Sequence, residues 1–209
     1  ISQRTVGKYM REMGIRAQWT KPWTTTTRDS DFSKELHNVL NEQFNPDSPD
    51  EVRCTDITCI WTMEGSVNLI SIMDLYSRRI IGWVLSETLA QWVVQAIEKS
   101  KAERKVSMPR VVHSARGIQY VRCAYVQATK GMQRSYSRKA YQWDNACIES
   151  FHALTKREWL NRYKIHNYRE AYSLVFEYIE GFYNTIRVHS HCDFKSPNEY
   201  EYNYLISNN

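Results

Sequence analysis

Three short β-type segments in immediate succession restrict the folds open to this chain more than any other pattern. Residues 52–62, 67–74 and 79–86 are apolar, or alternate apolar with polar residues, and are rich in Ile, Val, Thr and Trp. The connections at 63–65 and 76–78 are too short to hold a helix, so the pattern predicts three antiparallel strands joined by tight turns. A large part of one sheet therefore comes from residues that are close together in the sequence.

A regular alternation of helical and strand patterns follows these three segments. In chain order it predicts a helix at about 89–105, a strand at 111–113, a helix at 118–129, a strand at 132–136, and two long helices at 143–162 and 168–187. Strands separated by helices pair in parallel, whereas strands joined by tight turns pair antiparallel. The sequence thus predicts an α/β fold with a mixed five-stranded sheet flanked by helices.

The residues ahead of the first strand divide into two parts. Residues 1–15 contain a short helix in which Arg4, Lys8 and Arg11 lie off an apolar stripe. It resembles the last helix of a helix-turn-helix DNA-binding module, although a surface helix without such a role is the alternative. Residues 16–50 are expected to form an extended linker and then a helix at 32–44. The main domain would occupy residues 51–204, with 205–209 as a tail.

Charge is distributed unevenly along the chain. Residues 1–28 carry 6 basic and 1 acidic residue, residues 29–75 carry 2 and 10, and residues 76–209 carry 20 and 12. Basic flanks around an acidic centre are typical of a protein that binds a polyanion beside a site that collects cations. Ordinary solvated surface charge is the alternative.

Neither a membrane span nor a cysteine framework is indicated. No apolar stretch approaches the roughly 20 residues needed to cross a bilayer. The 5 cysteines form no C-x-x-C pair, which argues against a disulfide scaffold and against a cysteine-based zinc site. A reducing cytoplasm is the expected compartment.

Two acidic residues occupy positions that call for a special explanation. Asp56 lies among β-branched residues inside a predicted strand, where an unpaired carboxylate is costly. Glu149 lies on a predicted helix seven residues before Lys156, so these two side chains share a helix face. A metal ion would explain the position of Asp56. Pairing with an arginine would do so as well, and Glu149 taken alone is an ordinary helix acid.

Four sequence blocks occur in an order that changes this interpretation. They are the Asp-x-Thr strand at Asp56, the hairpin Met73-Asp74-Leu75-Tyr76-Ser77-Arg78, the stretch His113-Ser114-Ala115-Arg116-Gly117-Ile118-Gln119-Tyr120, and the block Asp144-Asn145-Ala146-x-x-Glu149-Ser150-Phe151. Together they resemble transposases of bacterial insertion sequences that have a retroviral-integrase-type DDE core. In that family the third stretch runs His-Ser-Asp-x-Gly-x-Gln-Tyr, so Ala115 stands where the second catalytic carboxylate is expected.

The resemblance implies a ribonuclease-H-like fold and metal-dependent cleavage and strand transfer of the ends of a mobile element. It implies two Mg²⁺ or Mn²⁺ ions, with Asp56 bridging both, Glu149 holding one and position 115 holding the other. Because an alanine methyl group ligates no metal, we predict that this chain folds and binds DNA but has little or no joining activity. Asp74 is expected to cap its hairpin turn or to pair with Arg78.

The resemblance also implies DNA as partner, at least a dimer on the DNA, and a location in the bacterial cytoplasm at the nucleoid. Candidate DNA contacts, besides the three basic residues of the first helix, are Arg116, Arg138, Lys139, Asn145, Lys156, Arg157 and Arg187. Two alternatives remain open. One is a non-catalytic DNA-binding protein derived from a transposase, and the other is a nuclease that cuts without joining.

Overall fold

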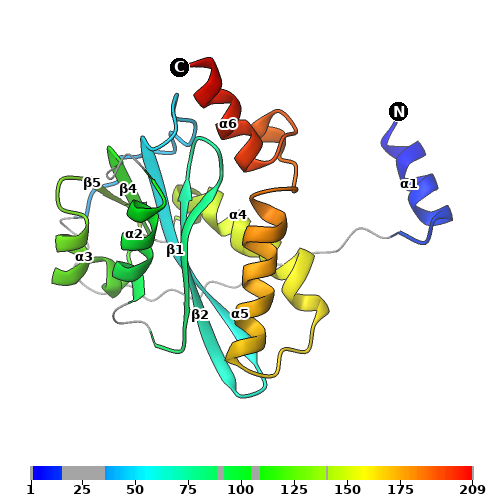
Figure 1. Ribbon diagram of the computed structural model, residues 1–209, viewed down its shortest axis with the longest axis horizontal. Coiled ribbons are helices and arrows are strands. Elements are labelled where there is room, and N and C mark those ends of the chain that lie inside the picture. The colour runs from blue at the N-terminus through cyan, green and yellow to red at the C-terminus, as the bar shows by residue number, and fades with distance from the viewer. Residues whose placement is uncertain (1, 16–35, 89–91, 105–108, 140, 209) are drawn as a thin grey trace.

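The computed structural model describes residues 2–15, 36–88, 92–104, 109–139 and 141–208. The predicted linker at 16–31 and the start of the predicted helix at 32–44 lie outside these residues. Within them, one five-stranded mixed sheet forms the centre of the main domain (Figure 1).

The sheet has the strand order β3-β2-β1-β4-β5. Strands β1 (Val52–Thr62), β2 (Gly65–Asp74) and β3 (Ile80–Ser86) form the antiparallel part. Strands β4 (Val111–Ser114) and β5 (Gln133–Tyr136) add to the other edge of β1 in parallel. The predicted mixed sheet, with its tight turns and its helical crossovers, is confirmed.

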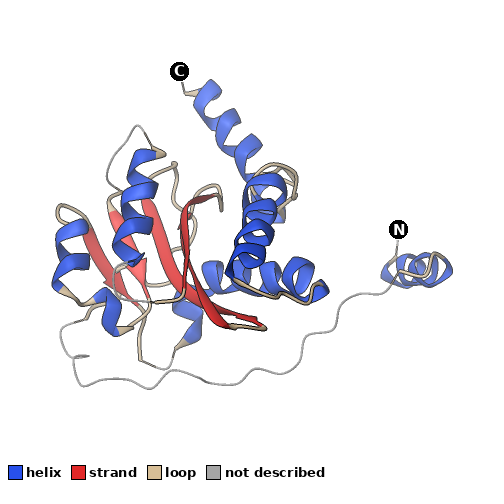
Figure 2. Cartoon of the chain, turned by 60° about the horizontal axis from the view of Figure 1, so that its bottom comes forward, coloured by secondary structure: helices blue, strands red, loops and turns tan. Residues whose placement is uncertain are grey.

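Helices cover both faces of this sheet (Figure 2). On one face α2 (Trp92–Ala102) and α3 (Cys123–Ala128) bury Val93, Ile97 and Tyr125 against Ile70 and Ile72 of β2. The opposite face is covered by α4 (Ala146–Leu154) and α5 (Tyr168–Phe176). Because successive residues of a strand point to opposite faces, β2 supplies both cores and is buried over most of its length.

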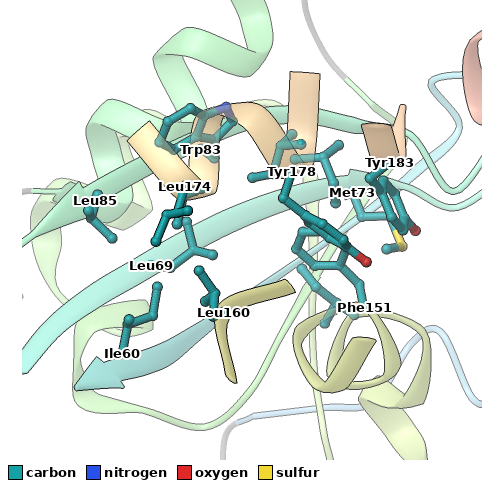
Figure 3. Packing of buried hydrophobic residues seen from close by; sticks show 14 of the residues in the cluster. Ile60, Leu69, Met73, Trp83, Leu85, Phe151, Leu160, Leu174, Tyr178 and Tyr183 are labelled. Carbon is teal, nitrogen blue, oxygen red and sulfur yellow. The ribbon is translucent and has the colours of Figure 1, made fainter. Parts of the chain in front are cut away.

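The core on the α4 and α5 side is rich in aromatic rings (Figure 3). Phe151 of α4 packs edge-on against Tyr183, with ring centroids 4.7 Å apart, and also contacts Tyr178. Met73 of β2 and Leu174 of α5 belong to the same buried cluster. This packing fixes α4 against the sheet, and α4 is the helix that carries Glu149.

The helix predicted at 32–44 does not form over the part that is described. Residues 36–44 are irregular, and Asn41 and Glu42 have positive φ angles of 46° and 61°. The backbone N–H groups of Val39 and Leu40 both donate to Ser135 Oγ at 2.9 Å, and Leu40 is buried in the core. The helical spacing of the apolar residues was therefore misleading. In a helix these backbone N–H groups would bond to carbonyl oxygens of the preceding turn, whereas here they bond to the Ser135 side chain of β5.

Three other helices are less regular than predicted. The stretch 118–129 is split into a 3-10 turn, Ile118–Tyr120, and α3, because Arg122 between them has an extended backbone. The two long helices change to π-helical turns at Thr155–Trp159 and Glu177–Tyr183. Such turns commonly occur next to functional sites, and the first follows α4 directly.

The ends of the chain also differ in part from expectation. Helix α1 (Gln3–Glu12) forms as predicted and has no buried residue. The C-terminal helix α6 (Pro197–Ser207) continues through three of the residues expected to form a tail, since Ser196 caps its first turn and Pro197 fits its start. None of the helices in the described ranges is both long and apolar enough to cross a membrane.

Candidate active site

The register of β1 and β4 brings two of the three predicted site positions together. Thr55, within β1, pairs with Ser114, the last residue of the parallel strand β4. Asp56 and Ala115 each follow this pair directly, so they occupy neighbouring positions where β4 ends. Ala115 packs partly against the cluster that contains Tyr120. The side chain of Asp56 is 19% exposed.

Helix α4 supplies the third position. Burial, together with the nearby charge of Asp56, raises the pKa of Glu149 from 4.5 to about 7. The contribution of Asp56 to this shift indicates that the two carboxyl groups are close enough to repel each other. Asp56 and Glu149 are 93 positions apart in the sequence, so it is the fold that brings them near each other.

The protein surrounds these acids with polar groups that hold the site together. Asn145, directly before α4, donates from Nδ2 to the carbonyl oxygen of Thr55 at 3.3 Å. His152 lies with Nδ1 3.6 Å from Asp56 Oδ2 and with Nε2 3.2 Å from Ser71 Oγ. These contacts tie the start and the third turn of α4 to β1 and β2, and so fix Glu149 relative to Asp56.

Sequence analysis missed the role of His152. It lies three residues after Glu149 on α4, so the two side chains share a helix face, and this spacing could have identified it. Tyr120 was also missed. Burial raises the pKa of the Tyr120 phenol well above its ordinary value, and the charge of Asp56 adds to the effect. Tyr120 therefore lies near Asp56 as a neutral hydroxyl.

The loop between β5 and α4 is fixed by Asp144. This carboxylate is fully buried and accepts hydrogen bonds from the backbone N–H and the side chain of Arg138, the closest at 2.6 Å. Burial alone would raise the pKa of Asp144, but the hydrogen bonds and charge of Arg138 outweigh burial and lower it. The hydrogen bonds of Asp144 thus join the loop at Arg138 to the residues directly before α4.

His113, the first residue of the alanine-containing motif, is buried beneath the same loop. Its ring lies 2.8 Å from Ser135 Oγ and 3.2 Å from Ser137 Oγ. Burial lowers the pKa of His113 to about 4, although the negative charge of Asp144 opposes the shift. The ring is therefore neutral at physiological pH and acts as a hydrogen-bonding support below the carboxyl end of β4.

Two carboxylates of this site are chemically suited to a divalent cation. Asp56 and Glu149 offer the oxygen ligands that Mg²⁺ prefers. Across the described parts of the chain, no three His, Cys, Asp or Glu side chains gather closely enough to hold a metal ion. Position 115, beside Asp56, carries an alanine, whose side chain offers no metal ligand.

The candidate DNA contacts are distributed over several environments. The guanidinium of Arg138 pairs with Asp144 and Glu42, and that of Arg187 forms two hydrogen bonds to Glu158 at 2.7 and 2.8 Å. Arg116 donates to the carbonyl oxygens of Ser137 and Leu36. These three arginines connect parts of the chain, so their charges are partly committed within the protein.

Other candidates remain closer to the acids or to solvent. Burial lowers the pKa of Lys156, while the negative charge of Asp56 partly offsets the shift, which places the ammonium near the acidic site. Arg157 is half-buried and Lys139 is exposed. On α1, Arg4, Lys8 and Arg11 are exposed, and Lys8 lies 3.8 Å from Glu12.

The fold defines a class of protein. A mixed five-stranded sheet with helices on both faces is the fold that this chain shares with retroviral integrase catalytic cores. The chain superposes on a chain of the simian T-cell lymphotropic virus intasome in complex with PP2A regulatory subunit B56 gamma, with a TM-score of 0.62, 12% identity, and 82% of this chain and 60% of that chain covered. The HTLV-2 integrase catalytic core domain in complex with magnesium matches with a TM-score of 0.57 at 12% identity, covering 75% of this chain and 99% of that one.

Sequence comparison places the chain more narrowly. Residues 46–142 and residues 130–197 each match a family model described as "Integrase core domain". The transposase for insertion sequence element IS904 of Lactococcus lactis subsp. lactis (strain IL1403) is 34% identical over 201 residues, which cover 95% of this chain and 79% of that protein. The chain belongs to the insertion-sequence transposases that have an integrase core, as the sequence blocks had indicated.

Proposed function

We propose that this chain is the DNA-joining core of an insertion-sequence transposase whose active site lacks one of three metal-binding carboxylates. The observation that carries the proposal is the Thr55–Ser114 register, because it sets Asp56 beside Ala115. The effect of Asp56 on the pKa of Glu149 supports a position of Glu149 close to both. In a complete site of this class, all three positions would be acidic.

The chemistry explains why a third carboxylate matters. To cut a phosphodiester and join its 3′-hydroxyl to another strand, charge must be neutralised on both the attacking and the leaving oxygen, which two divalent ions about 4 Å apart can provide. Asp56 and Glu149 would hold Mg²⁺ or Mn²⁺ here, and the relative that was solved with magnesium has the same fold. With alanine at position 115, one ion would lose a protein ligand.

The decisive experiment replaces the methyl group of Ala115 by a carboxylate. Ala115→Asp should convert a chain with little or no joining activity into one that cleaves and joins the DNA flanking its own gene in the presence of Mg²⁺ or Mn²⁺. The control is the double variant Ala115→Asp, Asp56→Asn, which should again lack cleavage and joining activity. Joined product is measured on gels. Equal, robust activity with and without Ala115→Asp would refute the site assignment.

A non-catalytic DNA-binding protein is the second candidate, and Ala115 is the observation that favours it. The two candidates differ in what the restored carboxylate does. If Ala115→Asp binds the same DNA as the unmodified chain but never cleaves it with either metal, the chain has lost catalysis by more than one change. DNA binding measured in EDTA separates this outcome from a failure to bind.

The proposed partners follow from the same chemistry. DNA phosphates would contact Lys156 near the acids, together with Lys139, Arg157 and the exposed basic residues of α1. A transposase holds two element ends, so we propose at least a dimer on DNA, which sedimentation of the complex with a labelled element end would test. In a bacterium such a protein would act in the cytoplasm, at the nucleoid.

A further inference from the structure

A cavity lies against α4, on a different side of the helix from that carrying Glu149. Its volume is about 460 Å³. The walls come from α4, from the hairpin residue Arg78 and from the segment 187–191 that precedes α6. Met73, Phe151 and Tyr183, which lie side by side at one end of the core in Figure 3, also line it. Arg187, His189 and His191 are among its polar lining residues.

Arg78 brings a positive charge to this cavity that no acid neutralises. Its guanidinium donates to the carbonyl oxygens of Phe44 and Leu75 and to Asn45 Oδ1, all of which are uncharged. Among the described residues, no carboxylate lies within ion-pairing distance of Arg78. An uncompensated guanidinium in a partly buried cavity favours an anionic ligand.

The backbone conformation of Arg78 also favours a ligand site at this cavity. Its φ angle is +60°, in the left-handed region that residues other than glycine seldom adopt. Such strain costs on the order of 1 kcal/mol or more and persists where the surroundings require one geometry, often at ligand sites. Here the geometry holds the guanidinium of Arg78 against the cavity.

The two histidines are neutral, and their protons can be assigned from their partners. His191 Nε2 lies 2.9 Å from the carbonyl oxygen of Tyr76 and must donate, so Nδ1 is the acceptor for Arg78 Nη2 at 3.4 Å. His189 Nε2 faces Arg187 Nη1 at 3.4 Å and must accept, which leaves the proton on Nδ1. No acceptor for the His189 Nδ1 proton lies within hydrogen-bonding distance in the described part of the chain, so the group is free to bind a ligand oxygen.

The pKa shifts of His189 and His191 agree with neutral rings. Burial lowers the pKa of His189 to about 4, and the positive charges of Arg187 and Arg78 contribute; Glu158, which pairs with Arg187, opposes the shift. For His191, burial and then Arg78 lower the pKa, while the Tyr76 carbonyl and Asp193 oppose the shift. Burial thus keeps both rings neutral, and the charge of Arg78, which contributes to both shifts, is the positive charge left for an anion.

We infer that this cavity binds a phosphodiester group of the DNA strand, with Arg78 supplying the charge and His189 a hydrogen bond. The inference rests on the proposed function. Cys147 and Ser150 of α4 line the cavity and flank Glu149 in sequence, so a strand whose reactive phosphate lies at Glu149 would place a nearby phosphate here. The cavity would anchor the strand without reading its sequence.

The first test adds a negative charge to the far wall of the cavity. Ser190 lines the cavity, is exposed and begins a 3-10 turn remote from α4 in sequence, so Ser190→Glu should repel a phosphate without removing a core contact. The matched control is Ser173→Glu on the exposed face of α5. Binding of a fluorescein-labelled mixed-sequence duplex is measured in EDTA over a range of salt concentrations, so that metal binding plays no part.

We expect Ser190→Glu to weaken binding several-fold and to reduce the slope of log K against log salt by about 1, the change expected for one lost phosphate contact. Ser173→Glu should change neither quantity. If the unmodified chain binds DNA but the two variants behave alike, the cavity inference is wrong while the proposed function stands.

A second measurement is independent of DNA binding. Inorganic phosphate titrated into the full chain should shift the NMR ring signals of His189 and His191, and should leave those of the exposed His166 in place. Ser190→Glu should abolish the shift. Phosphate binding in the cavity by a chain that does not bind DNA would overturn both the strand assignment and the proposed function. An absence of any shift would overturn the anion site itself.

Discussion

Two pairs of carboxylates in this domain, Asp74 with Glu201 and Asp56 with Glu149, have opposite electrostatic surroundings. Glu201 of α6 accepts hydrogen bonds from Arg104, from Arg79 at 3.2 Å and from Ser77 at 2.9 Å. Burial would raise the pKa of Glu201, but Arg104 and Arg79 outweigh it and lower that pKa. At Glu149, by contrast, burial and the charge of Asp56 raise the pKa to about 7.

Asp74 shows how a buried acid serves structure. It is completely buried, and its oxygens accept backbone N–H bonds from Asp50 at 2.7 Å, Tyr76 at 3.0 Å and Ser77 at 3.1 Å. The predicted turn-capping role is confirmed, whereas pairing with Arg78 is wrong, because the guanidinium of Arg78 donates to carbonyl and amide oxygens instead. Burial still raises the pKa of Asp74, despite the opposing charge of Arg104.

The comparison separates two uses of buried negative charge. Where arginines and backbone N–H groups surround the acids, the charge joins α6 and the hairpin to the sheet. Where the acids repel one another, the folded state carries an energetic cost that a bound cation would relieve.

The largest expected effect is on the compensated pair. Glu201→Gln should lower the free energy of unfolding by about 3 to 5 kcal/mol, because it leaves Arg104 and Arg79 without their carboxylate. The matched control, Glu199→Gln, changes an exposed residue of the same helix and should cost less than about 0.5 kcal/mol. Urea unfolding measures both. Equal effects of the two variants would show that the buried network does not hold α6.

The uncompensated pair should respond in the opposite direction. The pKa of Glu149 is about 7 in the folded chain and 4.5 in its reference state, so folding stability is fully present below about pH 4.5 and falls as the pH rises towards 7. Glu149→Gln should therefore stabilise the metal-free chain at pH 8 by on the order of 2 kcal/mol and have little effect at pH 5. Thermal unfolding in EDTA at both pH values checks the sign. Destabilisation at pH 8 would contradict the assignment.

The smallest expected effect concerns Ala115→Asp, examined for stability and not for activity. A third carboxylate should cost roughly 1 to 2 kcal/mol without metal, since one pKa unit of added repulsion corresponds to about 1.4 kcal/mol. Millimolar Mg²⁺ should restore the loss by binding only the folded state. The unmodified chain should gain less from Mg²⁺. Melting temperatures with and without Mg²⁺ measure the difference, and identical metal responses would remove the case for position 115 as a ligand.

Much of the fold was predictable because the relevant information is local. The alternation in β1, β2 and β3 and the short turns between them predicted the antiparallel half of the sheet. A short apolar run at 111–113 predicted β4, and β5 was predicted at 132–136. Residues 36–44 were predicted wrongly, because their apolar spacing fits a helix equally well. Only the hydrogen bonds from Val39 and Leu40 to Ser135 decide the backbone there, and Ser135 lies 95 residues away from Leu40.

The residues of the candidate site could be predicted from the sequence, but the ion pairs around them could not. Motif order alone selected Asp56, Ala115 and Glu149. Nothing local indicated that Arg138 and Arg187 would be paired with Asp144 and Glu158, because ion pairs form between segments that meet only in the folded chain. The cavity at Arg78 was missed for the same reason: its walls come from three separate stretches of sequence.

By itself the sequence determined the strand pattern, the family and the absence of a carboxylate at position 115, since each depends on residue identity and spacing along the chain. The tertiary structure alone decided which charges are neutralised and which are left exposed to a ligand. Compensation depends on distances of a few ångströms between residues far apart in sequence, and electrostatic energy falls off with that distance, not with separation along the chain.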